Sequence, residues 1–150
     1  MENKIHINYE NIFEYSKDTI EYMFVDKAEV IPGQEAWGTK LSSHQDWYYK
    51  IHFPGDPIMP GVLVMEAIMT TGSFIIYTME GKKELRLLFN ESKNMKMYKS
   101  VRPGDVLNTH AVLNSYRLGV GKFTGEAFCE DGLVCKMEFT LIAPEEFPRR

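Results

Sequence analysis

The sequence is poor in cysteine and offers no obvious metal ligands. Only two cysteines occur among the 150 residues, Cys129 and Cys135. They flank Asp131-Gly132, a dipeptide typical of two-residue hairpin turns. In that register Cys129 faces Val134 rather than Cys135, so we expect no disulfide and no cysteine-based metal site. The four histidines show no paired spacing either, and we predict neither a metal nor another cofactor.

Several motifs that would assign an activity are also missing. There is no G-x-S-x-G nucleophile turn, no Walker loop and no G-x-G-x-x-G leading into a helix, which excludes the usual serine hydrolases, P-loop enzymes and dinucleotide-binding domains. Residues 1–13 contain no apolar signal core and no Arg-rich leader. We therefore expect a cytoplasmic protein whose cysteines stay reduced.

Positive charge is scarce overall and concentrated in one segment. The formal net charge is −4, which disfavours a general role in binding nucleic acid. Residues 82–102 nevertheless carry seven basic and two acidic side chains, a net +5, which leaves −9 for the rest of the chain. This segment is either a solvated basic surface or a docking surface for an acidic partner.

The pattern of the whole chain predicts one α+β domain, residues 1–150, with an antiparallel sheet and one buried helix. Residues 1–20 have no clear pattern, and Pro32-Gly33 predicts the turn of a hairpin within residues 21–39. Short connections between strands favour antiparallel neighbours. Further strands are expected over residues 85–90, 93–101, 106–118, 121–130 and 133–142.

The predicted helix spans Gly61–Met79 and is apolar on nearly every side, which is typical of a buried helix. It is long enough to cross a membrane, but six polar or small residues interrupt it. No second apolar segment of that length occurs, so we expect no membrane span.

Glu66 is the only charged side chain between Pro57 and Met79. A carboxyl group on an apolar helix must be paired, or its pKa must rise until it holds a proton. One interpretation is structural, with Glu66 capping a loop or pairing with a basic residue. The other is functional, with Glu66 acting as a general acid or positioning a leaving hydroxyl.

His52 precedes a loop rich in proline and glycine that ends at the helix. A histidine beside aromatic residues is often structural, but this loop allows His52 and the helix N-terminus to converge. The backbone amides of Gly61 and Val62 would then be donors for a carbonyl oxygen that gains negative charge. A base, an acid and such donors suit removal of a proton α to a carbonyl with loss of a β-hydroxyl.

The segment from His52 to Ala67, HFPGDPIMPGVLVMEA, resembles the signature of the β-hydroxyacyl-acyl carrier protein dehydratases of the FabZ/FabA type. Residues 24–27, FVDK, resemble the first-strand phrase of that family. Residues 96–105, KMYKSVRPGD, resemble its basic strand and Pro-Gly-Asp turn. The resemblance covers about residues 22–142.

The resemblance implies a hot-dog fold, in which a curved antiparallel sheet wraps around a long helix. It implies a homodimer, which some members assemble into a trimer of dimers. The implied reaction converts a (3R)-hydroxyacyl group on acyl carrier protein to the trans-2-enoyl product, in fatty-acid or related acyl-chain biosynthesis.

The resemblance also implies roles for individual residues. His52 corresponds to the base, Glu66 to the acid from the opposite protomer, and Gly61 to the residue whose N–H holds the thioester carbonyl. Glutamate at position 66 favours the FabZ-like branch, without isomerisation. The expected substrate-binding residues are Phe53, Pro60, Gly61 and Val62, and the expected carrier-docking residues are Lys93, Lys96, Lys99 and Arg102.

Three features depart from the family pattern. Thr70 stands where glutamine is usual, Ile51 stands where glycine precedes the histidine, and Tyr98 and Ser100 replace residues that are often Arg and Pro. A specialised substrate would explain these differences. The alternatives are a hot-dog thioesterase, an enoyl-coenzyme A hydratase, or a non-catalytic protein that binds acyl thioesters.

Overall fold

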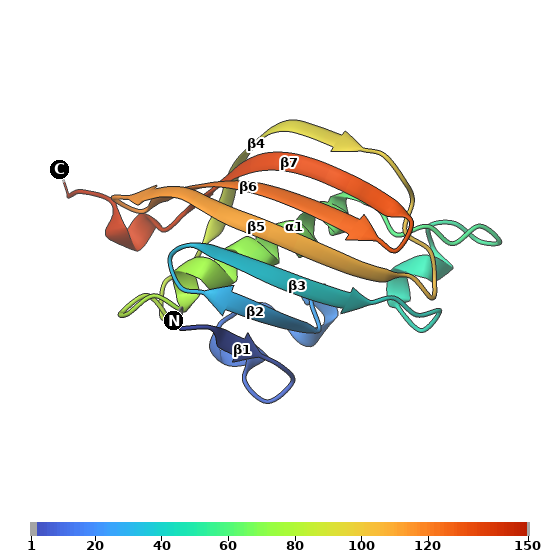
Figure 1. The fold of residues 1–150 in the computed structure, drawn as a ribbon, viewed down its shortest axis with the longest axis horizontal. Coiled ribbons are helices and arrows are strands. Elements are labelled where there is room, and N and C mark those ends of the chain that lie inside the picture. Colours follow the sequence, from blue (N-terminus) through green and yellow to red (C-terminus); the bar gives the residue numbers. More distant parts are fainter. Residues whose placement is uncertain (1–2, 150) are drawn as a thin grey trace.

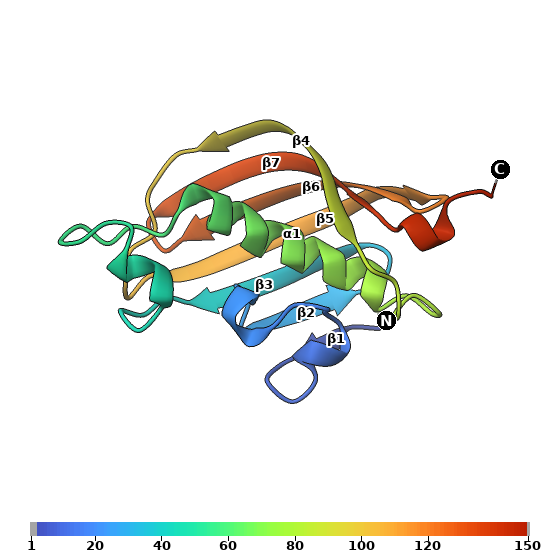
Figure 2. The ribbon, with the colours of Figure 1, turned by 180° about the vertical axis from the view of Figure 1, so that it is seen from behind.

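The computed structural model describes residues 3–149. One long helix lies across a curved antiparallel sheet of seven strands in the order β1-β2-β3-β5-β6-β7-β4 (Figure 1). From the opposite side, the helix crosses the concave face of the sheet (Figure 2). This arrangement confirms the predicted α+β class and the hot-dog fold.

The strands and helix match most of the predicted ranges. The helix α1 spans Gly61–Tyr77, and the first hairpin consists of β2 (Lys27–Ile31) and β3 (Glu35–Leu41) around Gly33, whose φ is +74°. A positive φ there is what the Pro-Gly turn requires. The last three strands are β5 (Val106–Arg117), β6 (Val120–Cys129) and β7 (Gly132–Ile142).

One prediction about strands was wrong. The structure has one strand, β4 (Leu88–Met97), where we expected two, and two register shifts replace the expected break. This strand ends the sheet and is largely exposed, so its sequence does not alternate. The unpatterned N-terminus contains β1 (Ile5–Ile7) and two short 3-10 turns, Ile12–Glu14 and Ile20–Tyr22.

The predicted register around the cysteines was also wrong, although both cysteines are free as expected. Cys129 pairs with Gly132, and Cys135 lies opposite Ala127, because the register shifts between Ala127 and Phe128. Both thiols are buried, and burial raises the pKa of each to about 11. They are therefore poor nucleophiles at neutral pH.

The helix lies very close to the sheet because glycine faces it at two positions. A Cβ atom on Gly38 of β3 would come within 2.4 Å of Thr71 Oγ1, and one on Gly125 of β6 within 2.3 Å of Ile68 Cγ2. At the first position Thr71 Oγ1 lies 2.6 Å from Thr109 Oγ1 of β5. Side chains larger than hydrogen would push the helix away from the sheet.

The apolar surface of α1 is covered by the sheet, as expected for a buried helix. Ile68, Phe74, Ile75 and Ile76 have no exposed surface. Within residues 3–149, no helix combines the length and apolar character needed to cross a membrane.

Candidate active site

His52 follows a short 3-10 turn, η3 (Trp47–Lys50), which connects β3 to the proline-rich loop. Its backbone N–H donates to the carbonyl of Tyr48 at 3.1 Å, and its own carbonyl accepts from the N–H of Ile58 at 2.9 Å. The ring atom Nδ1 lies 2.8 Å from the carbonyl oxygen of Ile58. A carbonyl only accepts, so this partner assigns the proton to Nδ1 and leaves Nε2 with a lone pair in the neutral ring.

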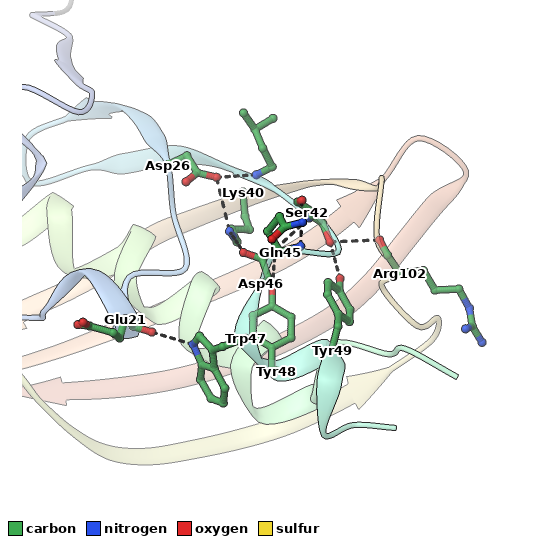
Figure 3. A network of polar contacts seen from close by, with 12 residues as sticks. Glu21, Asp26, Lys40, Ser42, Gln45, Asp46, Trp47, Tyr48, Tyr49 and Arg102 are labelled. Carbon is green, nitrogen blue, oxygen red and sulfur yellow. Dashed lines mark hydrogen bonds and ion pairs between the residues drawn. The ribbon is translucent and has the colours of Figure 1, made fainter. Parts of the chain in front are cut away.

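An ion-pair network around a buried lysine fixes the turn that precedes His52 (Figure 3). Lys40 is only 7% exposed, and its Nζ lies 3.1 Å from Asp46 Oδ1 and 3.9 Å from Asp26 Oδ2. The other oxygen of Asp46 accepts from the N–H of Ser43 at 2.9 Å and the hydroxyl of Tyr48 at 3.2 Å. Each charged group is therefore paired and hydrogen-bonded, as burial requires.

Our sequence analysis missed this network, although one signal was present. Side chains alternate between the two faces of a strand, so Lys40 shares a face of β3 with Ala36 and Gly38, both of which are buried. A lysine on an inward face needs acidic partners. The acids themselves, Asp26 and Asp46, have no distinguishing pattern in the sequence.

The N-terminus of α1 presents two backbone donors. No acceptor for the N–H groups of Gly61 and Val62 occurs within residues 3–149, and the first hydrogen bond at this end runs from Leu63 N to Pro60 O at 2.9 Å. The N–H of Met59 donates to Val101 O at 2.9 Å. This bond joins the loop between His52 and the helix to the segment that follows β4.

Glu66 lines a pocket of about 180 Å³ beside the middle of α1. The pKa of Glu66 is raised to about 7, first by burial and then by the negative charge of Asp18, while the nearby hydroxyl of Thr70 opposes the shift. The carboxyl therefore holds a proton near neutral pH and can act as an acid. The rest of the pocket is lined by Ser16, Lys17, Asp18, Met69, Thr70, Ser73, Tyr77, Leu87, Leu88, Phe89 and Leu141.

The structure does not bring His52 and Glu66 together within one protomer. His52 is not among the residues that line the Glu66 pocket, and no hydrogen bond joins the two side chains in the described part of the chain. The predicted substrate-binding residues lie on the His52 side. Phe53 stacks on the His52 ring with centroids 3.9 Å apart, and Pro60 is the N-cap residue of the helix.

The four predicted docking residues do not line one common hollow. Lys99 and Arg102 line the same shallow hollow, whereas Lys93 lines a different one with Glu91 and Glu138. Lys96 lies opposite Lys136 in the sheet. Three of the four have acidic partners, in the ion pairs Lys93–Glu91 at 3.9 Å, Lys99–Asp131 at 3.1 Å and Arg102–Asp56 at 2.8 Å.

A larger pocket of about 380 Å³ lies elsewhere, between the N-terminal segment and η3, and contains neither His52 nor Glu66. Its walls include Tyr9, Phe13 and Trp47, and its polar base is the Lys40 network. Since every charged group of that network has partners, the Glu66 pocket is the better candidate for chemistry.

Comparisons with known proteins identify the family of the chain. The FabA-like domain family matches residues 23–138. The chain is 36% identical over 124 residues to the 3-hydroxyacyl-[acyl-carrier-protein] dehydratase FabZ of Lactobacillus helveticus, covering 82% of this chain and 84% of the relative. It is 37% identical over 118 residues to the FabZ of Chloroflexus aggregans, covering 78% and 82%.

A solved structure shares the fold. The dehydratase heterocomplex ApeI:P from Xenorhabdus doucetiae superimposes with a TM-score of 0.76 at 13% identity, covering 89% of this chain and 90% of that one. The family match extends over most of the sequence and includes His52, Gly61 and Glu66. The chain therefore belongs to the FabA-like family, and its named relatives are FabZ-type dehydratases.

Proposed function

We propose that the protein converts (3R)-3-hydroxyacyl groups on acyl carrier protein to trans-2-enoyl groups and water. The observations that carry the proposal are the hydrogen bond between His52 Nδ1 and the carbonyl of Ile58 and the burial of the Glu66 carboxyl in its pocket. Glu66 has a pKa of about 7, and His52 has a free Nε2. One group can therefore give a proton while the other accepts one.

In the proposed reaction, Nε2 of His52 removes a proton from C2 of the acyl chain. Negative charge then develops on the thioester oxygen, which accepts hydrogen bonds from the free N–H groups of Gly61 and Val62. Glu66 gives its proton to the hydroxyl on C3, the C3–O bond breaks, and water leaves. The electron pair from the C2–H bond forms the new double bond, so no cofactor is needed.

We infer that each active site forms across a homodimer, because His52 and Glu66 do not share a pocket in one protomer. The outer edge of β4 has no neighbouring strand within residues 3–149. Leu88, Phe89 and Met95 on this strand are 40%, 49% and 42% exposed. An edge strand with exposed apolar side chains is suited to pairing with a second copy.

We further propose that the carrier docks beside Lys99 and Arg102. Both lie close in sequence to Val101, whose carbonyl holds the loop before the helix. A carrier bound there would deliver its thioester to the amides of Gly61 and Val62. Lys93 and Lys96 lie further along β4 and would contribute long-range attraction. The two free, buried cysteines are compatible with a reducing, cytoplasmic setting.

The test is dehydration of 3-hydroxyacyl carrier thioesters, followed by enoyl absorbance. We expect His52→Ala and Glu66→Gln each to lower kcat/KM by about 10²–10⁴-fold, the usual contribution of a general acid or base. Release of the carrier thiol is measured in parallel, because a hydrolase would free it. Lack of turnover at every chain length, or full activity of His52→Ala, would contradict the proposal.

Mixing the two inactive variants tests the shared site. In a symmetric dimer, subunit exchange creates mixed dimers with one intact site, so about a quarter of the wild-type activity should return. Variants of one kind mixed among themselves serve as the control. If subunits exchange but no activity returns, His52 and Glu66 do not combine across the interface.

A further inference from the structure

The Glu66 pocket has a row of polar side chains along one face of α1. Residues three, four and seven positions apart lie on the same face of a helix. Met69, Thr70 and Ser73 therefore follow Glu66 along the same pocket wall. Thr70 lies about 6 Å beyond Glu66 along the helix axis, at 1.5 Å per residue.

Of the hydroxyls around this pocket, Thr70 is the one without a partner in the described structure. Its side chain is 3% exposed, and its Oγ1 has no partner at normal hydrogen-bond geometry within residues 3–149, although it lies close enough to Glu66 to lower the pKa of that carboxyl. By contrast, Ser73 Oγ donates to the carbonyl of Thr70 at 2.6 Å. The hydroxyl oxygen of Tyr77 accepts from the N–H of Leu87 at 3.2 Å. Leaving a buried hydroxyl unpaired is unfavourable, so Thr70 is suited to a ligand that supplies the missing hydrogen bond.

The opposite wall of the pocket comes from the N-terminal segment and carries one carboxylate, that of Asp18. Asp18 faces Ser16, whose hydroxyl lies 3.4 Å from Asp18 Oδ2. Lys17 is engaged with Glu84, with Nζ and Oε2 3.4 Å apart. Asp18 therefore supplies acceptor oxygens in the same pocket as Thr70, and a ligand group that can donate a hydrogen bond is favoured over one that only accepts.

These polar groups are poorly matched to a plain hydrocarbon chain. The same pocket also has apolar lining from Met69, Leu87, Leu88, Phe89 and Leu141. An acyl chain with one polar substituent would satisfy both kinds of surface. Since Thr70 lies one helical turn past Glu66, which is proposed to act on the C3 hydroxyl, the substituent belongs several atoms further along the chain.

We propose that Thr70 and Asp18 bind a second hydroxyl group on the acyl chain, so that the preferred substrates are hydroxylated 3-hydroxyacyl thioesters rather than plain saturated ones. This inference rests on the proposed dehydratase function and names its substrate class. Thr70 is the specificity residue, because its hydroxyl can donate a hydrogen bond to the hydroxyl of the ligand or accept one from it.

The test compares 3-hydroxyoctanoyl with 3,5- and 3,7-dihydroxyoctanoyl carrier thioesters. Assays at about pH 6 keep Glu66 largely protonated in every variant. We expect the wild type to favour one dihydroxy substrate by about tenfold or more in kcat/KM, the usual effect of one buried hydrogen bond. Thr70→Val, which keeps the shape, should abolish that preference, so that kcat/KM for the dihydroxy substrate falls to the value for the plain chain measured with the same variant.

Ser73→Ala is the matched control, because it removes a pocket hydroxyl that is already bonded within the helix. It should leave the preference in place. Equal rates for all three substrates, or a preference that survives Thr70→Val, would overturn the inference while the dehydratase proposal stands.

If no substrate turns over, the proposed function fails, and binding decides the inference separately. Non-reactive thioether analogues of the same three chains are then titrated by calorimetry. Tighter binding of a dihydroxy analogue that is lost in Thr70→Val would support the pocket assignment, and equal binding would reject it.

Discussion

Two polar clusters in this molecule differ in how completely their groups are paired. Around Lys40, every charged group has a partner (Figure 3). The ammonium pairs with two carboxylates, and one of these, Asp46, also accepts from a hydroxyl and a backbone N–H. Around Glu66, the carboxyl has no cationic partner in the part of the chain that the structure describes, and the hydroxyl of Thr70 has no partner either. Both clusters are built from ordinary residue types.

The difference separates a structural role from a chemical one. A completely paired cluster has little left to offer a ligand, and its effect is to fix the backbone. An incompletely paired cluster lowers the free energy of unfolding of the protein relative to a fully paired one. Its unpaired groups remain available to a substrate. Mutations that remove one group should therefore have opposite effects on stability in the two clusters.

The largest stability effect is expected for Lys40→Met. Removing the buried ammonium leaves Asp46, whose side chain is 20% exposed, without its nearest counter-charge, and it also removes the partner of Asp26, which is 43% exposed. The free energy of unfolding should fall by about 3 kcal/mol, the lower end of the cost of breaking a fully buried pair. Urea unfolding at neutral pH and fixed protein concentration measures the change.

Lys83→Met is the control for that prediction. Lys83 pairs with Glu14 at 3.6 Å, but their side chains are 46% and 58% exposed, so its loss should cost less than about 1 kcal/mol. Equal losses for the two lysines would mean that the Lys40 network does not behave as a buried one.

The next effect is expected for Glu66→Gln, with the opposite sign. The pKa of Glu66 is raised from 4.5 to about 7, so between these values the folded protein holds a proton that the unfolded chain has lost. The stability of the wild type therefore falls as pH rises through this range and then levels off above pH 7. Glutamine does not titrate and should escape this loss.

Unfolding at pH 5 and pH 8 measures the difference. Glu66→Gln should gain about 2–3 kcal/mol relative to the wild type between the two pH values, and other titrating groups cancel in this comparison. A relative stability that does not change with pH would show that Glu66 has an ordinary pKa.

The smallest effect compares two neighbouring threonines. Thr71 Oγ1 donates to Ala67 O at 2.9 Å and bonds to Thr109, so Thr71→Val should lose about 1–3 kcal/mol by leaving Thr109 unpaired. Thr70→Val removes a hydroxyl without a partner and should change stability by less than about 0.5 kcal/mol. Thermal unfolding of both variants tests the contrast, and a larger loss for Thr70→Val would reverse it.

The sequence predicted the elements with strong periodic patterns and missed those without them. The β5–β7 strands alternate because one face of each is buried, and the helix is recognisable as a long apolar segment after the proline-rich loop. The β4 strand is exposed on both faces, and β1 has only three residues, so neither produces a clear pattern.

The candidate site was predictable to the same extent. Glu66 is conspicuous because a single charge interrupts an apolar helix, whereas His52 depends on the motif around it. Asp18 lies in a segment with no periodicity, and only the fold brings it to the Glu66 pocket. Thr70 was noticed as a departure from the family, but its missing hydrogen bond can only be seen once its neighbours are known.

The Lys40 network has a further consequence for the loop that it fixes. Ordering a flexible loop when a ligand binds costs conformational entropy, at about 1–2 kcal/mol for each backbone residue. Here a hydrogen bond already holds Asp46 and Tyr48 in place, and the backbone N–H of His52 donates to the carbonyl of Tyr48. A ligand that binds at His52 therefore contacts a loop that was ordered during folding. Its binding does not have to offset the entropy of ordering that loop, which favours affinity and correct orientation.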